Sequence, residues 1–378
     1  MATIENRDAR FSRGNVGYFL SVWPTDGCFR SADKPFRCAY CFYGRSDLRK
    51  EYRPPRMMDW KIARMVSDVV NEGWITGVSF FGGEPLCNWD AIHTILACVD
   101  EQKLRVAANK QQGSVFNITT NGVHLNKERL KLLAAKYVHI LLSFDGTPET
   151  QNKWRDNSYD EVMKNKELLL KYPSLSVTKT IADPMTYYED IQHIKELGFK
   201  NVFSNYLDPY GDVNYDKYDP YEFKEIYKRT VRDFDSKDGF HMGEIRGWKN
   251  IQINNMRGSQ PIGDGFTKLG LSVDPDGYYY QCHQAPTLPQ AFRIGHVSTG
   301  MDKDKEQMLR AVPNAPTCSK CVYRRTQCYV NMYHKHGRFG VDPPEHGMLW
   351  ERVMIEMYQE ITGLPGNKWY ACVGGDIC

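Results

Sequence analysis

Three cysteines near the start of the chain, Cys28, Cys38 and Cys41, have a spacing that suits metal binding. Some forty residues further on, residues 81–85 read Phe-Gly-Gly-Glu-Pro. Thiolates are good ligands for iron-sulfur clusters, and three of them on a four-iron cluster leave one iron without a protein ligand. That iron is free to bind a substrate or a cofactor. The two motifs together predict an iron-sulfur enzyme.

The cysteine motif resembles the cluster loop of radical S-adenosylmethionine (SAM) enzymes. Residues 37–44 read Arg-Cys-Ala-Tyr-Cys-Phe-Tyr-Gly, and the Gly-Gly-Glu-Pro run belongs to the same resemblance. In that family the open iron binds the amino and carboxylate groups of SAM, and an electron from the cluster cleaves SAM to methionine and a 5′-deoxyadenosyl radical. The resemblance implies that Cys28, Cys38 and Cys41 hold a 4Fe-4S cluster and that Tyr40 lies at the cofactor.

The first gap of the motif departs from the family pattern. Radical SAM enzymes usually have three residues between the first two cysteines, whereas Cys28 and Cys38 enclose nine. A zinc site or buried thiols are the alternatives, because a Cys-x-x-Cys pair is common in both. Disulfides are not expected, since residues 1–14 are polar and charged and contain no apolar secretion signal. The chain is therefore predicted to be cytoplasmic.

Gly82 and Gly83 follow a predicted strand at a point where the backbone must approach another group closely. Glu84 adds a carboxylate that suits an ammonium group. In radical SAM enzymes the equivalent segment receives the amine of SAM, so the resemblance implies that these three residues bind the cofactor. An ordinary β-to-α turn is the alternative, because paired glycines after strands are frequent.

A second cofactor segment is predicted at the fourth strand. Ser143, Asp145 and Arg155 resemble the segment in which a serine contacts the ribose of SAM and a downstream arginine meets its carboxylate. Arginine suits that role because its guanidinium group binds carboxylates through two parallel hydrogen bonds. The alternative is that Asp145 and Gly146 form a turn and that Arg155 is a solvated helix residue.

Six short β-rich runs alternate with amphipathic helices over the first two-thirds of the chain. The runs cover residues 16–22, 77–81, 115–119, 138–144, 175–181 and 201–205. One helix is expected after an N-cap at Asp59, with Val66 and Val70 on its apolar face, and another over residues 128–137. This alternation predicts an α/β fold with a parallel sheet and chemistry at the C-terminal strand ends. With the resemblance, it predicts that residues 1–240 form a partial (β/α)6 TIM-type barrel.

Composition is consistent with a soluble enzyme. The chain has 378 residues, of which 41% are hydrophobic and 25% are charged, and its net charge is +3. Nothing in these values indicates a dominant nucleic-acid surface, so nucleic acid is not an expected partner. The sequence contains no run of eighteen apolar residues, and no membrane span is expected.

Residues 241–378 are expected to form a cysteine-rich α+β extension. Asp276-Gly277 is a strong hairpin signal between two strand-like runs. The cysteines of this part are Cys282, Cys318, Cys321, Cys328, Cys372 and Cys378. Their order resembles the SPASM extension of radical SAM enzymes, in which a hairpin and a C-terminal helix carry auxiliary 4Fe-4S clusters.

The full SPASM pattern has seven cysteines and two auxiliary clusters, but cysteines are missing here near residues 263–265 and shortly after Cys328. The resemblance therefore implies one auxiliary 4Fe-4S cluster, with ligands from Cys318, Cys321, Cys328 and either Cys372 or Cys378. Zinc is the alternative, bound by the first three of these cysteines together with His334 or His336. Cys282 is then a buried thiol, a ligand in a rearranged site or a substrate contact.

His283 directly follows Cys282. In sulfatase-maturing relatives an aspartate at this place takes a proton after radical formation, so the resemblance implies that His283 is a catalytic base. Histidine suits this role near neutral pH, although a histidine in a hairpin can also serve only as a hydrogen-bonding residue. Cys87 and Cys98 are interpreted as structural thiols, because free cysteine packs as a small hydrophobe.

The resemblance also implies a reaction class. A 5′-deoxyadenosyl radical abstracts hydrogen from unactivated carbon, and SPASM-bearing relatives mostly oxidise, crosslink or epimerise peptides or proteins. A peptide or protein substrate and a flavodoxin- or ferredoxin-type electron donor are therefore expected. The alternatives are a small metabolite such as a nucleoside or sugar, and a non-catalytic zinc or electron-transfer protein. The first strand begins near Val16 and leaves no space for a leader-binding module, so a separate recognition protein or a small-molecule substrate fits as well.

Overall fold

The structure, a computed structural model of the chain, describes most of the predicted barrel and part of the predicted extension. The described residues are 18–31, 34–41, 55–110, 113–206, 215–245, 270–310, 329–339, 341 and 345–363. Five cysteines of the extension lie outside these ranges: Cys318, Cys321, Cys328, Cys372 and Cys378. Their role as auxiliary ligands stays a prediction.

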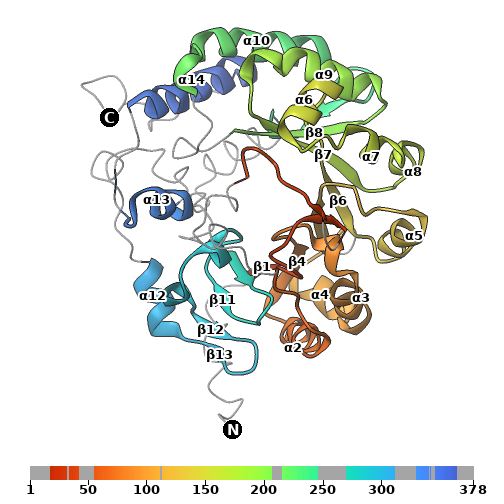
Figure 1. The fold of residues 1–378 in the computed structure, drawn as a ribbon, viewed down its shortest axis with the longest axis vertical. Helices are drawn as coiled ribbons and strands as arrows, with labels where there is room; N and C mark the ends of the chain where they lie inside the picture. Colours follow the sequence, from red (N-terminus) through yellow and green to blue (C-terminus); the bar gives the residue numbers. More distant parts are fainter. Residues whose placement is uncertain are drawn as a thin grey trace.

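The six strands predicted for the barrel all form and lie side by side in one parallel sheet (Figure 1). Their order in space follows their order in the sequence. The strands are β1 (Tyr18–Val22), β4 (Ile75–Phe80), β5 (Phe116–Thr120), β6 (His139–Ser143), β7 (Leu175–Ile181) and β8 (Asn201–Tyr206). Helices from the intervening segments cover the outer face of the sheet, as expected for right-handed β/α crossovers. The predicted α/β partial barrel is confirmed.

The sheet continues beyond residue 240 at both edges. β9 (His241–Met242) is parallel to β8 at one edge, and β10 (Gly270–Val273) is parallel to β1 at the other. β11 (Tyr279–Tyr280) pairs with β10 in antiparallel orientation across the predicted hairpin, where Gly277 has a φ of +90°. Within the described residues the sheet is open between β9 and β11. The first hairpin of the predicted extension is thus part of the barrel sheet.

Helix α2 (Trp60–Asn71) shows how the sequence pattern builds the outer layer. The Asp59 carboxylate accepts a hydrogen bond of 2.9 Å from the backbone N–H of Ile62, which confirms the predicted N-cap. Val66 and Val70 are fully buried in the core, as the apolar spacing predicted.

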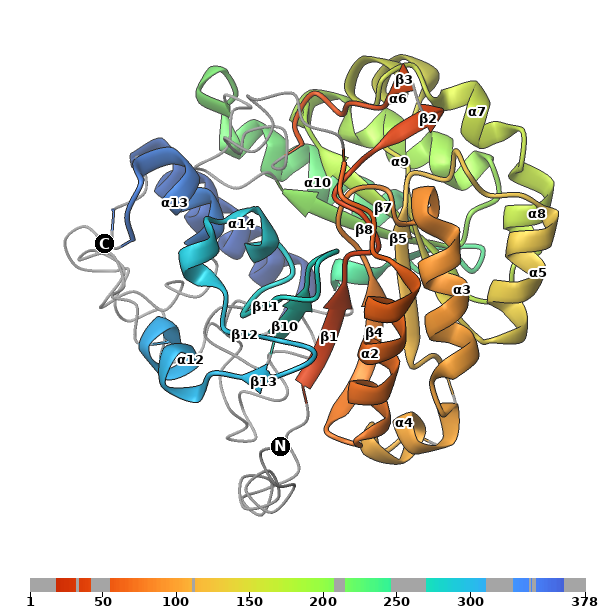
Figure 2. The ribbon, with the colours of Figure 1, turned by 60° about the horizontal axis from the view of Figure 1, so that its bottom comes forward.

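Further helices complete the outer layer and the C-terminal part. Those between the barrel strands are α3 (Trp89–Cys98), α4 (Glu101–Ala107), α5 (Lys127–Ala135), α6 (Pro148–Trp154), α7 (Tyr159–Met163), α8 (Lys166–Leu170), α9 (Tyr187–Glu196) and α10 (Pro220–Phe234). Those beyond the hairpin are α12 (Lys303–Arg310), α13 (Tyr329–His336) and α14 (Glu345–Thr362). Figure 2 shows α12 and α13 on the side of β10 and β11. No helix of the described ranges is long and apolar enough to cross a membrane.

Helix α14 connects the C-terminal part to the far side of the barrel. Its Trp350 ring packs 5.7 Å from the ring of Phe223 on α10, and Glu360 forms an ion pair with Lys224. The C-terminal part is therefore anchored at both edges of the sheet, by β10 at β1 and by α14 at α10.

Candidate active site

The glycine-rich segment after β4 packs against the segment that leads from β1 to Cys28. Backbone hydrogen bonds join Gly83 N–H to Thr25 O (3.0 Å) and Glu84 N–H to Gly27 O (2.8 Å). A Cβ atom on Gly83 would lie 2.2 Å from the carbonyl oxygen of Gly27. The group that approaches Gly83 closely is the backbone of Gly27 in the same chain. This contact fixes the backbone just before Cys28.

Glu84 is buried, and its carboxylate joins the ends of β4 and β5. One oxygen accepts hydrogen bonds from the Thr120 hydroxyl (2.7 Å) and from Leu86 N–H (3.1 Å), and the other accepts one from Asn121 N–H (2.7 Å). Burial raises the pKa of Glu84, while these hydrogen bonds act in the opposite direction. Thr120 and Asn121 thus support the site. A role for Glu84 at the amine of SAM stays a prediction.

The loop with Cys28, Cys38 and Cys41 begins directly after the glycine contact. The nine residues between the first two cysteines include a small hairpin of β2 (Phe29–Ser31) and β3 (Lys34–Pro35). All three cysteines are half-buried, and Cys41 N–H donates a hydrogen bond of 3.2 Å to Cys38 O. Within the described part of the chain, no three His, Cys, Asp or Glu side chains are arranged for a single metal ion.

Tyr40, Asp145 and Arg155 meet next to Cys38. The Tyr40 hydroxyl donates a hydrogen bond of 2.6 Å to Asp145 Oδ2, and Arg155 Nε lies 2.8 Å from the same oxygen. The guanidinium carbon of Arg155 is 5.3 Å from the centre of the Tyr40 ring, and its Nη1 is 4.0 Å from Cys38 Sγ. Arg155 is only 6% exposed, so the alternative of a solvated helix residue is wrong. Tyr40 of the cysteine loop and two residues of the second predicted cofactor segment therefore come together beside Cys38.

The electrostatics of this group depend on its burial. Burial lowers the pKa of Arg155, but Asp145, Tyr40 and Cys38 together raise it by more, so the pKa lies above its usual value. Burial raises the pKa of Tyr40 well above its usual value. Arg155 is therefore charged and Tyr40 neutral across the physiological range, which suits the binding of an anionic group at the guanidinium.

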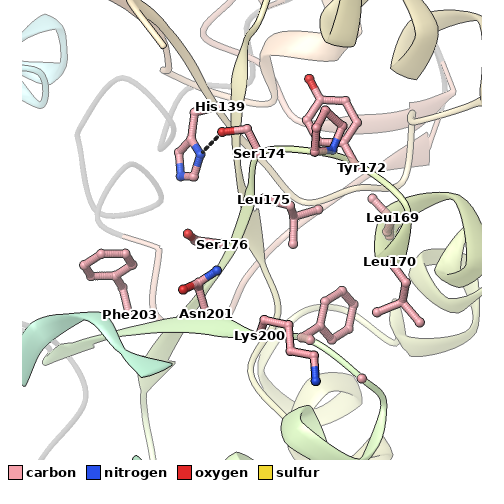
Figure 3. A pocket seen from close by; sticks show the side chains of 13 residues that line it. His139, Leu169, Leu170, Tyr172, Ser174, Leu175, Ser176, Lys200, Asn201 and Phe203 are labelled. Atoms are coloured by element: carbon pink, nitrogen blue, oxygen red, sulfur yellow. Dashed lines mark hydrogen bonds between the residues drawn. The ribbon is translucent and has the colours of Figure 1, made fainter. Parts of the chain in front are cut away.

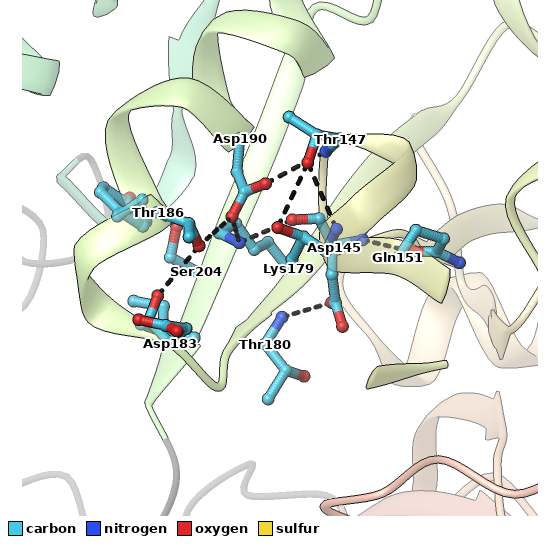
Figure 4. Close-up of polar contacts among 12 residues, drawn as sticks. Asp145, Thr147, Gln151, Lys179, Thr180, Asp183, Thr186, Asp190 and Ser204 are labelled. Atoms are coloured by element: carbon cyan, nitrogen blue, oxygen red, sulfur yellow. Dashed lines mark hydrogen bonds and ion pairs between the residues drawn. The ribbon is translucent and has the colours of Figure 1, made fainter. Parts of the chain in front are cut away.

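A buried ion pair on the other side of the sheet holds Asp145 in place (Figure 4). Lys179 Nζ donates hydrogen bonds to the Asp145 carbonyl oxygen (2.6 Å) and to Asp190 Oδ2 (2.8 Å). Asp190 in turn accepts hydrogen bonds from Thr147 N–H (3.1 Å) and from the Thr186 hydroxyl (2.8 Å). Sequence reasoning missed Lys179 and Asp190. The available signal was a lysine inside a β-rich run, at a position that the alternation assigns to the buried face.

His283 lies at the same end of the barrel. Its carbonyl oxygen accepts a hydrogen bond of 2.9 Å from the Trp23 indole N–H, and its ring is perpendicular to the Phe81 ring at 5.1 Å. Gly82 permits this packing, because its φ is +111° and a Cβ atom there would lie 2.7 Å from the Trp23 ring. The His283 side chain reaches solvent, but desolvation by the protein around the ring lowers its pKa to about 4. The imidazole is therefore neutral at pH 7 and able to accept a proton.

The remaining predicted residues have plainer surroundings. Cys282 is buried, with Sγ 3.8 Å from His283 Nδ1. Ser143 is buried at the end of β6. Burial raises the pKa of Cys87 to about 12, which agrees with a structural thiol. Cys98 Sγ accepts a hydrogen bond of 3.4 Å from Arg64.

The histidines proposed for a zinc site lie on α13. His334 Nε2 is 2.8 Å from the Thr287 hydroxyl oxygen, whereas the His336 side chain is exposed. The cysteines of that alternative lie outside the described residues, so zinc stays an open alternative to the auxiliary cluster.

A cavity of about 510 Å³ opens at the opposite end of the strands (Figure 3). His139, Leu175 and Asn201 in its wall are the first residues of β6, β7 and β8. Barrel enzymes carry out their chemistry at the C-terminal strand ends, so this cavity is not part of the candidate active site.

The surroundings of Arg155 fit a cofactor that carries a carboxylate. Arg155 Nε is buried and makes no well-aligned hydrogen bond to any described residue, although Asp145 Oδ2 is within ion-pair distance. A buried N–H that is poorly aligned with its neighbouring carboxylate gains little from it, and a second carboxylate would supply a better-placed acceptor. Half-buried thiols on the adjoining loop are suitable ligands for an iron-sulfur cluster. The residues present therefore fit both a cluster and SAM.

Comparison with protein families supports this reading. Residues 24–198 match the sequence profile of the Radical SAM superfamily, whose enzymes use a 4Fe-4S cluster and SAM. The matched range contains Cys28, Cys38 and Cys41, the glycine-rich segment and Arg155. It ends between β7 and β8 and does not include the predicted extension.

Two relatives are similar in sequence. The chain is 24% identical over 275 residues to a cysteine-type anaerobic sulfatase-maturating enzyme of Clostridium novyi, a match that covers 67% of this chain and 71% of that enzyme. It is 20% identical over 270 residues to the radical SAM cyclopropyl synthase TigE of Paramaledivibacter caminithermalis, covering 65% of this chain and 54% of TigE. The chain thus spans about half the length of TigE.

Two solved structures have the same fold. The structure of anSMEcpe with bound AdoMet has a TM-score of 0.65 at 19% identity, and the match covers 91% of this chain and 97% of that chain. The structure of SuiB from Streptococcus suis, bound to the precursor peptide SuiA, has a TM-score of 0.61 at 15% identity and covers 90% and 79%. The two solved structures share the fold of this chain, and the profile match assigns residues 24–198 to the radical SAM superfamily.

Proposed function

We propose that the chain is a radical SAM enzyme that modifies a peptide or protein by abstracting a hydrogen atom from it. The observation that carries the proposal is the meeting of Tyr40, Asp145 and Arg155 beside Cys38, at the C-terminal strand ends of a parallel barrel. When bound, the cluster and SAM together supply a 5′-deoxyadenosyl radical, which accepts the hydrogen atom.

The chain's own residues bind and orient these groups. Cys28, Cys38 and Cys41 would hold the cluster, and Arg155 would hold the carboxylate of SAM. Asp145 orients the guanidinium group of Arg155 through the 2.8 Å ion pair. Glu84, Gly82 and Gly83 fix the neighbouring strand ends, and Ser143, at the end of β6, would contact the ribose.

The open face of β7 and β8 favours a peptide over a phosphorylated metabolite. Lys179 and Ser204 point to the helix side, where they contact Asp190 and Tyr187. Successive strand residues alternate between faces, so Asn205, near the C-terminal end of β8, lies on the opposite, exposed face, where its side-chain amide donates a hydrogen bond of 2.7 Å to the Thr178 hydroxyl. Neutral polar groups of this kind suit peptide groups better than phosphate groups. The solved relatives SuiB with SuiA, and anSMEcpe with the Cp18Cys peptide, support the same substrate class.

His283 is proposed to accept a proton from the substrate after hydrogen abstraction. Its neutral imidazole lies beside Phe81, the residue that precedes the glycine-rich segment. The extension is proposed to carry one auxiliary 4Fe-4S cluster, and a flavodoxin- or ferredoxin-type protein is proposed as electron donor.

Metal analysis tests the proposal. The protein is purified without oxygen, reconstituted, and analysed for iron, sulfide and zinc, beside a variant with Cys28, Cys38 and Cys41 changed to alanine and a Cys98→Ala control. About eight irons per chain, falling to about four in the triple variant and unchanged in the control, are expected. About four irons and one zinc per chain would agree with a radical SAM enzyme but would show that zinc, and not an auxiliary cluster, is bound in the extension.

Activity analysis tests the substrate class. Under strong reduction the wild-type protein should release 5′-deoxyadenosine from SAM, and the triple cysteine variant should not. A short peptide encoded next to the gene should increase this release and gain a mass change. A protein without iron, or without any 5′-deoxyadenosine release, would contradict the proposed function.

A further inference from the structure

The unusual gap between Cys28 and Cys38 is tied to the turn that follows Arg155. Arg30, within the gap, places Nε 2.9 Å from Glu161 and Nη1 2.6 Å from Asp156. Its Nη2 also donates to the Asp156 carbonyl oxygen. The Arg30 side chain is only 11% exposed, so these ion pairs are shielded from solvent more than surface pairs are.

The turn that receives Arg30 has a distinct backbone conformation. Asp156 and Asn157 both lie in the left-handed region, with φ of +56° and +54°. Aspartate and asparagine adopt this conformation more readily than other non-glycine residues, so these residue types specify the turn. The turn also accepts a hydrogen bond of 3.1 Å from Arg37 N–H, just before Cys38, at the Asp156 carboxylate. The gap is therefore attached to one turn at both of its ends.

Figure 2 shows the hairpin β2–β3 beside α6, the helix that ends at Trp154. Ala39 N–H donates a hydrogen bond of 2.9 Å to Trp154 O, between the second and third cysteines. Residues 154–156 thus contact the cysteine loop at Cys38 and at the residue on either side of it.

We propose that Arg30 is a positioning residue that sets where Cys28 lies relative to Cys38 and Cys41; the proposal rests on the function proposed above. A gap of three residues limits the separation of two thiols through chain length alone, whereas a gap of nine leaves many more conformations. Arg30 replaces that constraint with a planar, forked contact of fixed geometry. Because Asp156 follows Arg155 directly, the same contact relates the cysteine loop to the guanidinium group at the cofactor.

The test compares Arg30→Met and Arg30→Lys with Arg105→Met. Methionine keeps an apolar stem against Phe36, over whose ring the Arg30 guanidinium lies at 4.8 Å. Arg105 is a matched control, because it pairs with Glu101 at 2.6 Å and donates to the Gly113 carbonyl oxygen, with 13% of its side chain exposed. Three readouts are measured: hydrogen exchange of the Phe36 and Cys41 amides in the metal-free protein, iron bound per chain after reconstitution, and the electron paramagnetic resonance spectrum with and without SAM.

Arg30→Met should increase amide exchange in the cysteine loop at least tenfold and lower bound iron from about eight to about six or fewer per chain, which is half or more of the cluster held by Cys28, Cys38 and Cys41. It should also broaden the spectral lines that shift when SAM is added. Arg30→Lys should fall between Arg30→Met and wild type, and Arg105→Met should match wild type in all three. Wild-type exchange and iron content in Arg30→Met would overturn the proposal, as would an equal loss in Arg105→Met. A wild-type protein that binds no iron would instead contradict the proposed function.

Discussion

Gly83 lies so close to Gly27 that a methyl group on Gly83 would be 2.2 Å from the carbonyl oxygen of Gly27. The obstacle is backbone, which cannot rotate away as a side chain can. The contact joins the end of β4 to the residue that precedes Cys28, so the glycine-rich segment and the cysteine loop form one unit.

Gly83→Ala is expected to separate these two segments. Overpacking of this kind costs about 1–3 kcal/mol of unfolding free energy, and the displaced cysteine loop should also bind less iron. Urea unfolding and iron analysis measure the two effects. Gly73→Ala is the control, because a Cβ atom there meets open space although φ is +89°. Its backbone strain should lower stability by about 1–2 kcal/mol but leave iron binding unchanged. Equal iron loss in both variants would show that Gly83 has no special role.

Asp145→Asn is expected to be strongly destabilising. Asp145 is fully buried, and its loss of charge leaves the nearly buried guanidinium of Arg155 without its counterion. Breaking a buried pair in this way costs about 3–5 kcal/mol, measurable by urea unfolding. Asp68→Asn is the comparison, since its pair with Arg64 is exposed and should be worth less than about 1 kcal/mol. If Asp145→Asn lowered the unfolding free energy by less than about 1 kcal/mol, other groups would have to compensate the charge of Arg155.

Lys179 and Asp190 are expected to be energetically coupled. Lys179→Met leaves a buried carboxylate without its counterion and should cost about 3–5 kcal/mol. The double variant Lys179→Met/Asp190→Asn removes both charges and should recover part of that loss, with a coupling energy of about 1–3 kcal/mol in a double-mutant cycle. SAM binding by the folded single variant should weaken, because Lys179 also holds the Asp145 carbonyl oxygen. Additive costs would show that the 2.8 Å contact is not a stabilising pair.

His283 is expected to make stability depend on pH between about 4 and 6.5. Its folded-state pKa of about 4 lies below the unfolded value, so in this window the unfolded chain binds a proton that the folded chain does not. Stability should therefore fall as the pH is lowered from 7 to 4. His283→Gln should lose less on acidification than wild type when Tm is measured across this range. Identical pH profiles for the two proteins, or a pKa near 6.5 for His283 by nuclear magnetic resonance, would contradict the assignment.

The barrel was predictable because its strands repeat one strong pattern. β7 spans the predicted residues 175–181, and the other five strands differ from their predicted ends by two residues or fewer. β9 and β10 were not predicted as barrel strands, because two and four residues are too short to show a period. Their pairing partners are also distant in sequence, and no local pattern records such a partner.

The candidate site was predictable only as separate motifs. The sequence indicated Asp145 and Arg155 each as a cofactor residue, but their ion pair follows from the path of α6 and could not be derived from either motif. The role of Arg30 could not be predicted for the same reason, since an arginine between two cysteines forms no recognisable sequence motif. The sequence did contain a signal for Lys179, which is a charged residue within a buried strand. Its ion-pair partner Asp190, on α9, could not be identified from that signal.

The parallel pairing of β10 with β1 decides where this protein can be divided. A fragment ending near residue 240 would leave the hydrogen-bonding edge of β1 open, and an open strand edge promotes aggregation. Grafting the C-terminal part of a related enzyme onto this barrel would therefore succeed only with a junction after Tyr280, so that the native hairpin remains with the host.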